Sequence, residues 1–175
     1  VPTILTALEP VRETVLPMLR QQLAREDLSP SQSMRLQLAL LPDQPDLADE
    51  LGQALLQANA EEFAMLRAGL KDHGSALADS LWQTLRNSDS TTSVRFRAAC
   101  ALAAFDPKNL DWPNQSELVA EWLVHQNPLV LGTWVEMLKP VRAELLPSLA
   151  QQFRESEAAE IRSVANTVIG VWAAD

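Results

Sequence analysis

The sequence predicts an all-α fold, a superhelix of about five antiparallel helix pairs, from three observations. Apolar residues recur at spacings of three and four, as in Leu77, Leu81 and Leu85, and no segment alternates at period two for more than a few residues. Glycine is scarce, with 5 residues in 175. Residues 8–22 return as residues 138–152 with Leu, Pro, Val-Arg, Leu-Pro and Gln-Gln in register. Self-similarity of this kind is typical of helical stacks.

Prolines, glycines and capping residues divide the chain into short helices. Pro30 and Ser31 open one helix, Asp46 is a good N-cap for the next, and Asn127-Pro128 marks a later start. After a first helix that contains Pro17, we expect helices at about residues 30–41, 46–57, 60–70, 75–87, 92–105, 115–125, 128–138, 141–155 and 158–173.

The longest irregular stretch is residues 106–114, whose two prolines and two asparagines favour a loop. We expect Trp112 to hold this loop against the body of the protein. Pro17 and Pro147 lie at the same place in two similar helical patterns, where an interior proline costs about 3 kcal/mol unless the helix kinks. We therefore expect a kink that the architecture uses.

Three helix pairs share one layout, at about residues 16–41, 77–102 and 146–169. In each, an acidic residue in the turn precedes an apolar-Arg dipeptide that opens the second helix. In the second and third pairs a small residue, Ala98 or Ala165, follows near the middle of that helix. This layout resembles the HEAT repeat and covers most of the chain. The middle pair departs from the pattern because Asp79 stands where the other two have proline, and the first pair has a longer turn.

The resemblance to HEAT repeats implies a HEAT/armadillo-like α-solenoid and a structural role for these charges. In HEAT stacks the equivalent Arg and Asp bind one another and the backbone between neighbouring repeats. The expected inter-repeat ladder consists of the acidic residues Asp27, Asp89 and Glu157 and the arginines Arg35, Arg95 and Arg162.

Shorter pairs at about residues 46–70 and 115–138 alternate with the regular ones. The whole chain, 1–175, is expected to form a single HEAT-like repeat domain cut from a longer protein, because both ends look truncated in this register. Residues 94–107, the later tryptophans and residues 138–142 are also similar to helical segments of very large bacterial multidomain proteins that carry a serine/threonine kinase domain. No Gly-rich loop, His-Arg-Asp or Asp-Phe-Gly is present, so this resemblance implies a non-catalytic segment.

The charge of the chain excludes several classes of partner. The net charge is −9, from 14 basic and 23 acidic residues, and no Lys/Arg cluster offers a site for nucleic acid or an anionic membrane. No stretch approaches the roughly 20 apolar residues of a spanning helix. The opening Val1-Pro2-Thr3 has no basic region of a signal peptide, and the single Cys100 fits a reducing, cytoplasmic compartment.

Few residues suggest chemistry. His73 and His125 fall in different repeats, so they cannot form a metal site or a catalytic pair by themselves. Cys100 lies in a helix that is apolar on almost every face, which predicts a buried and unreactive thiol. Acidic pairs such as Asp49-Glu50 and Glu61-Glu62 fit solvated helix faces. We therefore expect no catalytic residue, no cofactor and no metal.

These observations favour a protein-interaction or spacer module, which presents a curved face lined mainly by second helices to a protein or to neighbouring domains of the same chain. Neither nucleic acid, membrane nor a small-molecule substrate is expected as a partner. The acidic charge favours a neutral or basic partner surface. One alternative is an enzyme on a HEAT-like scaffold, such as the alkylpurine DNA glycosylases, but those need a basic groove. Another is a structural spacer without any ligand.

Overall fold

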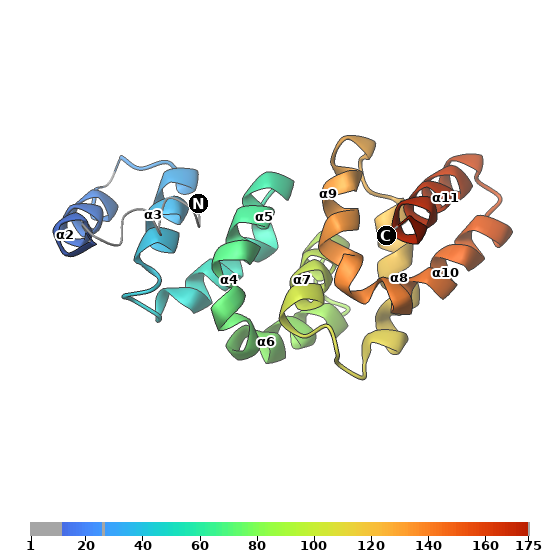
Figure 1. Cartoon of the computed structure of the whole chain (residues 1–175), viewed down its shortest axis with the longest axis horizontal. Helices are drawn as coiled ribbons and strands as arrows, with labels where there is room; N and C mark the ends of the chain where they lie inside the picture. The colour runs from blue at the N-terminus through green and yellow to red at the C-terminus, as the bar shows by residue number, and fades with distance from the viewer. Residues whose placement is uncertain (1–11, 26, 175) are drawn as a thin grey trace. The chain divides into compact units, whose positions relative to one another are not determined.

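A computed structural model describes residues 12–25 and 27–174, and all regular structure within them is helical (Figure 1). The all-α class is therefore confirmed. In chain order the elements are α2 (Arg12–Leu23), α3 (Pro30–Leu40), α4 (Leu47–Gln57), α5 (Ala60–Gly69), the 3-10 helix η2 (Lys71–His73), α6 (Gly74–Arg86), α7 (Thr92–Phe105), α8 (Trp112–Val124), α9 (Pro128–Leu138), the 3-10 helix η3 (Lys139–Val141), α10 (Arg142–Glu155) and α11 (Ala159–Ala173).

The chain divides into two compact units, Val1–His73 and Gly74–Asp175. In the first unit, α2 packs on α3 and α4 packs on α5, while α3 also contacts α4 and α5. Its core is built from large apolar side chains that are fully buried: Leu40, Leu51, Leu55, Phe63 and Leu66. Their burial at helical spacing is what the periodicity of the sequence predicts.

The second unit contains two closely packed pairs, α6 with α7 and α10 with α11. Contacts also join helices that are not consecutive, since α7 packs on α9 and α8 packs on α10. All five tryptophans of the chain lie in this unit, each at most 9% exposed: Trp82, Trp112, Trp122, Trp134 and Trp172. Large aromatic side chains of this kind dominate the apolar surface that a small unit can bury.

Side-chain caps define several of the helix starts. Ser29 and Gln32 form a reciprocal capping box on α3, and Asn59, Thr91 and Asn127 accept backbone N–H groups of α5, α7 and α9. α9 begins at Pro128, as the Asn-Pro pair predicts.

Asp46 precedes α4 as expected, but its side chain makes no capping hydrogen bond. The first backbone N–H groups of α4 are bound instead by the preceding turn, Leu47 N to Gln44 O at 3.1 Å and Ala48 N to Pro45 O at 3.0 Å. A backbone acceptor therefore replaces the carboxylate that the sequence suggested.

The expected loop at residues 106–114 is shorter than predicted, because α8 begins at Trp112 rather than near residue 115. Pro113 is tolerated there since the first turn of a helix needs no amide donor. Trp112 does anchor the segment: it is fully buried, and its Nε1 donates to the carbonyl oxygen of Asp106 at 3.0 Å. Pro17 and Pro147 are each the sixth residue of their helices, α2 and α10.

Candidate functional site

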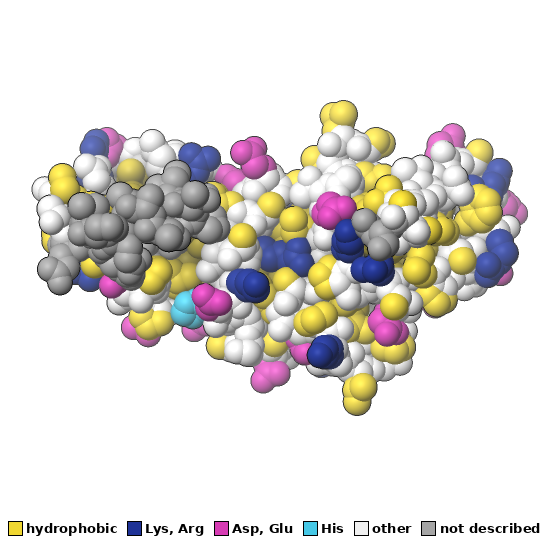
Figure 2. All heavy atoms as spheres, in the orientation of Figure 1, with side chains coloured by type: hydrophobic (Ala, Val, Ile, Leu, Met, Phe, Trp, Pro, Cys, Tyr) yellow, Lys and Arg dark blue, Asp and Glu magenta, His cyan; other side chains and the backbone are white. Residues whose placement is uncertain are grey.

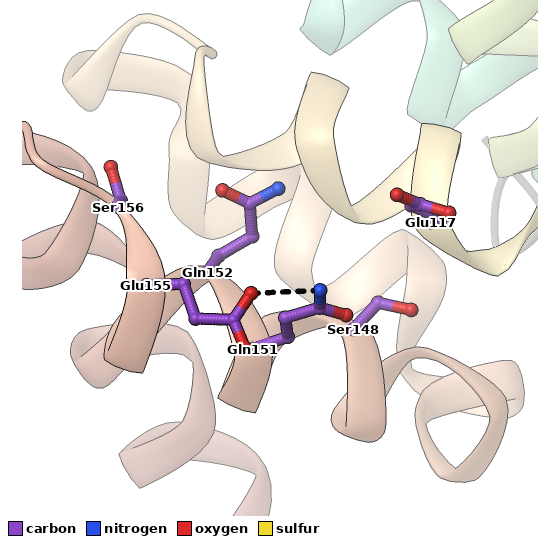
Figure 3. Close-up of a pocket in the computed structure, with 6 residues that line it drawn as sticks. All are labelled: Glu117, Ser148, Gln151, Gln152, Glu155 and Ser156. Carbon is purple, nitrogen blue, oxygen red and sulfur yellow. Dashed lines mark hydrogen bonds between the residues drawn. The ribbon is translucent and has the colours of Figure 1, made fainter.

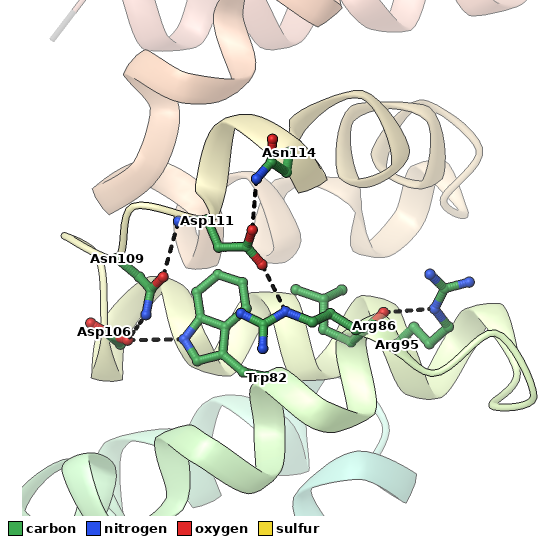
Figure 4. Close-up of polar contacts among 8 residues, drawn as sticks. Trp82, Arg86, Arg95, Asp106, Asn109, Asp111 and Asn114 are labelled. Carbon is green, nitrogen blue, oxygen red and sulfur yellow. Dashed lines mark hydrogen bonds and ion pairs between the residues drawn. The ribbon is translucent and has the colours of Figure 1, made fainter.

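The arginine near the start of α7 binds two neighbouring helices. Arg95 Nε donates to the carbonyl oxygen of Leu85, near the end of α6, at 2.8 Å (Figure 4). The guanidinium carbon of Arg95 also lies 4.9 Å from the centroid of the Trp122 ring in α8. This arrangement satisfies a carbonyl in the last turn of a helix and adds a cation–π contact.

Arg162 has the corresponding place in α11. Its Nη1 donates to the carbonyl oxygens of Ser156 at 2.7 Å and Glu157 at 3.0 Å, in the turn after α10. Both arginines therefore bind backbone carbonyls at the end of the first helix of their pair. Both sets of bonds lie within a single helix pair, whereas the resemblance implies contacts between neighbouring repeats.

The carboxylates that we expected to pair with these arginines do not do so in the described residues. Asp27 binds Arg25 at 2.6 Å instead of Arg35, and this hydrogen-bonded ion pair lowers the pKa of Asp27 below its ordinary value. Within the part of the chain that the structure describes, Asp89 makes no ion pair, and Arg162 binds the carbonyl of Glu157 rather than its carboxylate. For Arg95 and Arg162, a backbone carbonyl takes the place of the acid. The role of these residues between repeats stays a prediction.

A polar network ties the end of α7 to α6 and α8 (Figure 4). The carboxylate of Asp106 accepts from Trp82 Nε1 at 2.9 Å and from Asn109 Nδ2 at 2.6 Å. Its carbonyl oxygen accepts from Trp112. Because these donors come from three segments, Asp106 fixes the turn between α7 and α8 rather than offering a free carboxylate for chemistry.

A second acidic residue completes this network. The carboxylate of Asp111 accepts hydrogen bonds from Asn114 Nδ2 at 2.8 Å and from Arg86 Nε at 2.7 Å. Both bonds lower the pKa of Asp111, and the bond from Asn114 has the larger effect. Arg86 also lies over the Trp82 ring, 5.1 Å from its centroid. Between the two acids the loop holds Leu110 in solvent with 94% of its surface exposed.

One surface hollow, of about 200 Å³, lies between α8 and α10 (Figure 3). Gln151 Nε2 donates to Glu155 Oε2 at 2.9 Å across one turn of α10, and Glu117 faces them from α8. The hollow is lined by polar side chains only: Glu117, Ser148, Gln151, Gln152, Glu155 and Ser156. Such a lining can hydrogen-bond a polar chain. Its carboxylate Glu155 is bound by Gln151, and its hydroxyl Ser148 lies 3.4 Å from the hydroxyl of Ser116, so neither forms a nucleophile–base pair with the other.

A larger hollow of about 420 Å³ lies between the first turn of α7 and the last turn of α8, and we call it the α7–α8 hollow. The α8 side chains are fixed by their own helix, since His125 Nδ1 donates to Glu121 O at 2.7 Å and Gln126 Nε2 donates to Trp122 O at 2.9 Å. Its lining consists of Thr92, Ser93, Glu121, Trp122, His125 and Gln126. The sequence showed His125 and Trp122 only as separate features, because nothing in their spacing brings them against the start of α7.

The other candidate residues lie apart. Cys100 is fully buried in α7, as predicted. His73 lies in η2 of the first unit, and His125 follows α8 in the second. Within residues 12–25 and 27–174, no three His, Cys, Asp or Glu side chains form a group that could hold a metal ion. No helix in the same residues is both long and apolar enough to cross a membrane.

Charged side chains of both signs are scattered among uncharged ones on the face seen in Figure 2. Comparison with protein-family models, curated proteins and solved structures finds no match to this chain. Any functional conclusion must therefore be drawn from the chain's own residues.

Proposed function

We propose that this chain is a non-catalytic protein-interaction module, an α-solenoid of HEAT-like helix pairs that presents a helical surface to a protein or to neighbouring domains of the same chain. The observation that carries the proposal is the packing within Gly74–Asp175. There α7 packs on α9 and α8 packs on α10, in addition to the pairs α6–α7 and α10–α11. Contacts between alternate helices are what a stack of hairpins requires, because each hairpin buries its apolar face against the next.

Recurring local features support the same proposal. Proline is the sixth residue of both α2 and α10. Arg95 and Arg162 each bind a carbonyl at the end of the preceding helix. Because the same features recur at equivalent places, we interpret them as parts of a repeated unit rather than as a catalytic set.

The second unit also exposes apolar side chains on backbone that side-chain hydrogen bonds hold in place. Leu110 is 94% exposed beside the Asp106 network, and Leu129 is 92% exposed in the first turn of α9. The amide of Leu129 is bound by the Asn127 side chain at 2.9 Å. A partner that covers such a residue has little backbone to order, so the contact contributes more of its gross energy to affinity.

An affinity experiment tests the proposal. The immobilised chain is exposed to a protein extract beside two variants, Leu110→Asp/Leu129→Asp and the control Asn166→Asp, which adds charge to an exposed position on α11. We expect proteins that the wild type and the control retain and the double variant loses. Equal retention by all three proteins, or no retention at all, would contradict an interaction role and leave the spacer alternative.

Binding to DNA is the sharpest counter-test. With a net charge of −9, the chain should not retard a DNA duplex at low salt, where cationic surfaces bind most strongly. Retention would overturn the proposal in favour of a DNA-directed enzyme on the same scaffold. We also propose a cytoplasmic location, which fits a chain with a single cysteine.

A further inference from the structure

We propose that the hollow between α8 and α10 receives one arginine side chain of a partner protein. The site rests on the proposed interaction role and specifies the chemistry that one part of the surface recognises. The hollow measures about 200 Å³ and is lined by side chains of both helices (Figure 3).

A carboxylate stands on each wall of the hollow. Glu117 of α8 makes no hydrogen bond or ion pair with any residue that the structure describes. Glu155, the last residue of α10, accepts from Gln151 Nε2 through its Oε2 atom, and its Oε1 atom accepts from no described donor. Figure 3 shows the two carboxylates on opposite sides of the hollow, with Ser148 and Gln152 between them. A positively charged group placed between the walls can therefore bind both carboxylates at once.

The basic residues of the surrounding helices leave these carboxylates free. α8 contains neither lysine nor arginine. Arg142 and Arg154 belong to α10, but neither lines the hollow. Arg162 of α11 binds the carbonyl oxygens of Ser156 and Glu157, so its charge is engaged by backbone acceptors. The net charge of −9 adds a general attraction for a basic partner, and the hollow gives that attraction a place.

The acceptors of the lining favour a guanidinium over an ammonium or a metal ion. Besides the two carboxylates, the lining offers the amide oxygen of Gln152 and the hydroxyl of Ser148. A guanidinium carries five N–H donors in one plane, whereas an ammonium has three on a single atom. A metal ion would find two carboxylates only, because no three His, Cys, Asp or Glu side chains gather in residues 12–25 and 27–174. Arginine therefore matches acceptors that are spread over both walls.

Apolar side chains beside the hollow favour a protein as the source of the arginine. Leu118 follows Glu117 on α8 and is 37% exposed, and Phe153 follows Gln152 on α10 and is 43% exposed. Exposed apolar side chains next to a charged hollow are typical of interfaces in which apolar contacts surround a buried arginine. A free cation would leave both side chains uncovered. We therefore assign the hollow to an arginine that has apolar neighbours in its own chain.

Nuclear magnetic resonance of the whole chain tests the site, because backbone amide signals can be followed on each wall. The ligands are acetyl-Gly-Leu-Arg-Leu-Gly-amide, the same peptide with Lys or citrulline in place of Arg, and arginine amide alone. We expect the Arg peptide to shift the amide signals of Glu117, Ser148 and Gln152. The Lys peptide and arginine amide should shift them less, and the citrulline peptide, which keeps the shape but lacks the charge, should not shift them.

Each ligand can contradict one part of the proposal. No shift by the Arg peptide, or equal shifts by the citrulline peptide, would overturn the site. A Lys peptide that binds as tightly as the Arg peptide would overturn the assignment to a guanidinium. Equal binding of arginine amide would overturn the assignment to a partner protein.

Substitutions separate this site from the general attraction of an acidic chain. Glu117→Gln and Glu155→Gln should each weaken binding of the Arg peptide by about two- to five-fold, the range of an exposed charge pair. Glu61→Gln, at an exposed position of α5 in the other unit, removes the same charge and should leave binding unchanged. Equal weakening by all three variants would refute the site, since the net charge alone would then attract the peptide. Undisturbed indole signals of the buried tryptophans show that the variants are folded.

The outcome is separable from that of the affinity experiment. Retained proteins together with unmoved Ser148 and Gln152 signals would refute this site and leave the interaction role. A peptide-induced shift in a chain that retains no protein would refute the interaction role and with it the partner assigned to the hollow.

Discussion

α7 and α11 are the second helices of two packed pairs in the same unit, and their sequences align with an offset of 67 residues, Val94-Arg95 on Ile161-Arg162. One face of α7 is apolar and at most 2% exposed: Phe96, Ala99, Cys100 and Ala103. The aligned face of α11 is exposed and consists of small or polar residues: Ser163, Asn166, Thr167 and Gly170.

The neighbours of the two helices explain this difference. The Phe96 ring meets the Trp134 ring of α9 edge-on, with centroids 5.4 Å apart, and η3 also packs on α7. No described helix covers the aligned face of α11. A helix pair packed there would have to bury hydroxyl and amide groups, each of which needs a hydrogen-bond partner. The residues of each face thus match its surroundings in this structure: they are apolar where α9 and η3 pack on α7, and small or polar where no described helix packs on α11.

The largest effect is expected at Phe96. Phe96→Ala removes a ring that is 2% exposed and packed on Trp134, so the free energy of unfolding should fall by about 3–5 kcal/mol. Ser163→Ala, at the aligned exposed position, should change it by less than about 0.5 kcal/mol. Urea unfolding of both variants measures the contrast, and similar losses would show that the two faces do not differ as described.

Exchanging the residues at one aligned position of the α7 and α11 faces should have the next largest effect on stability. Ala99→Asn places an amide at a fully buried position, and we expect a loss of about 2–4 kcal/mol. Asn166→Ala should instead stabilise the protein by up to about 0.5 kcal/mol through better helix propensity. A tolerated Asn at position 99 in the same denaturation experiment would refute the close packing of α7.

Replacing Arg95 or Arg162 should lower stability by smaller amounts, which should differ between the two. Arg95→Ala loses a hydrogen bond to a carbonyl and the contact with Trp122, for about 2 kcal/mol, while Arg162→Ala loses only bonds to carbonyls, for about 1 kcal/mol. Both should lower the melting temperature, and Arg154→Ala on exposed α10 surface serves as the control. An unchanged melting temperature for Arg95→Ala would contradict a structural role for Arg95.

A substitution on the exposed face of α11 is expected to raise the stability of the protein. No heavy atom lies within 4 Å of a Cβ built on Gly170, so Gly170→Ala should raise stability by about 0.5–1 kcal/mol. Gly132→Ala, in an equally open place on α9, should behave alike. Thermal denaturation measures both, and destabilisation by Gly170→Ala alone would mean that something packs on this face of α11.

The smallest effect on stability is expected at Asp111, which precedes α8 and binds Arg86 of α6. Hydrogen bonds from Asn114 and Arg86 lower its folded pKa, so its contribution is fully present above the unfolded pKa and is lost as pH falls through the folded one. The stability difference between wild type and Asp111→Asn should be small at pH 7, because the carboxylate is solvated, and should vanish in acid. Phe153 aligns with Arg86, so α10 offers no equivalent partner. A difference that grows in acid would contradict this assignment.

Much of the fold could be predicted because it depends on local signals. Helix spacing, Asn127-Pro128 and the apolar run around Cys100 each act within a few residues, and they gave helix ranges that match the structure within about three residues. Gly74 shows the limit of such signals. It reads as a breaker after α5, but it begins α6, and a Cβ there would lie 2.7 Å from the Phe105 ring. That constraint comes from a helix about thirty residues later in the chain.

The candidate site was less predictable because it depends on acceptors that the sequence does not distinguish. An acidic residue next to a turn offers both a carboxylate and a carbonyl, and Arg162 binds the carbonyl of Glu157. The α7–α8 hollow brings Thr92 beside Trp122, which requires the packing of two helices and has no sequence pattern.

The distribution of tryptophan has a consequence for spectroscopy. The chain has no tyrosine, and all of its tryptophans lie in Gly74–Asp175, so intrinsic fluorescence reports on that unit alone. Far-ultraviolet circular dichroism reports the helices of both units. If the two units unfold independently, the dichroism transition will contain a phase that fluorescence lacks, whereas a cooperative chain will give coincident curves. A single sample, without any label, can thus show whether Val1–His73 and Gly74–Asp175 share one unfolding transition.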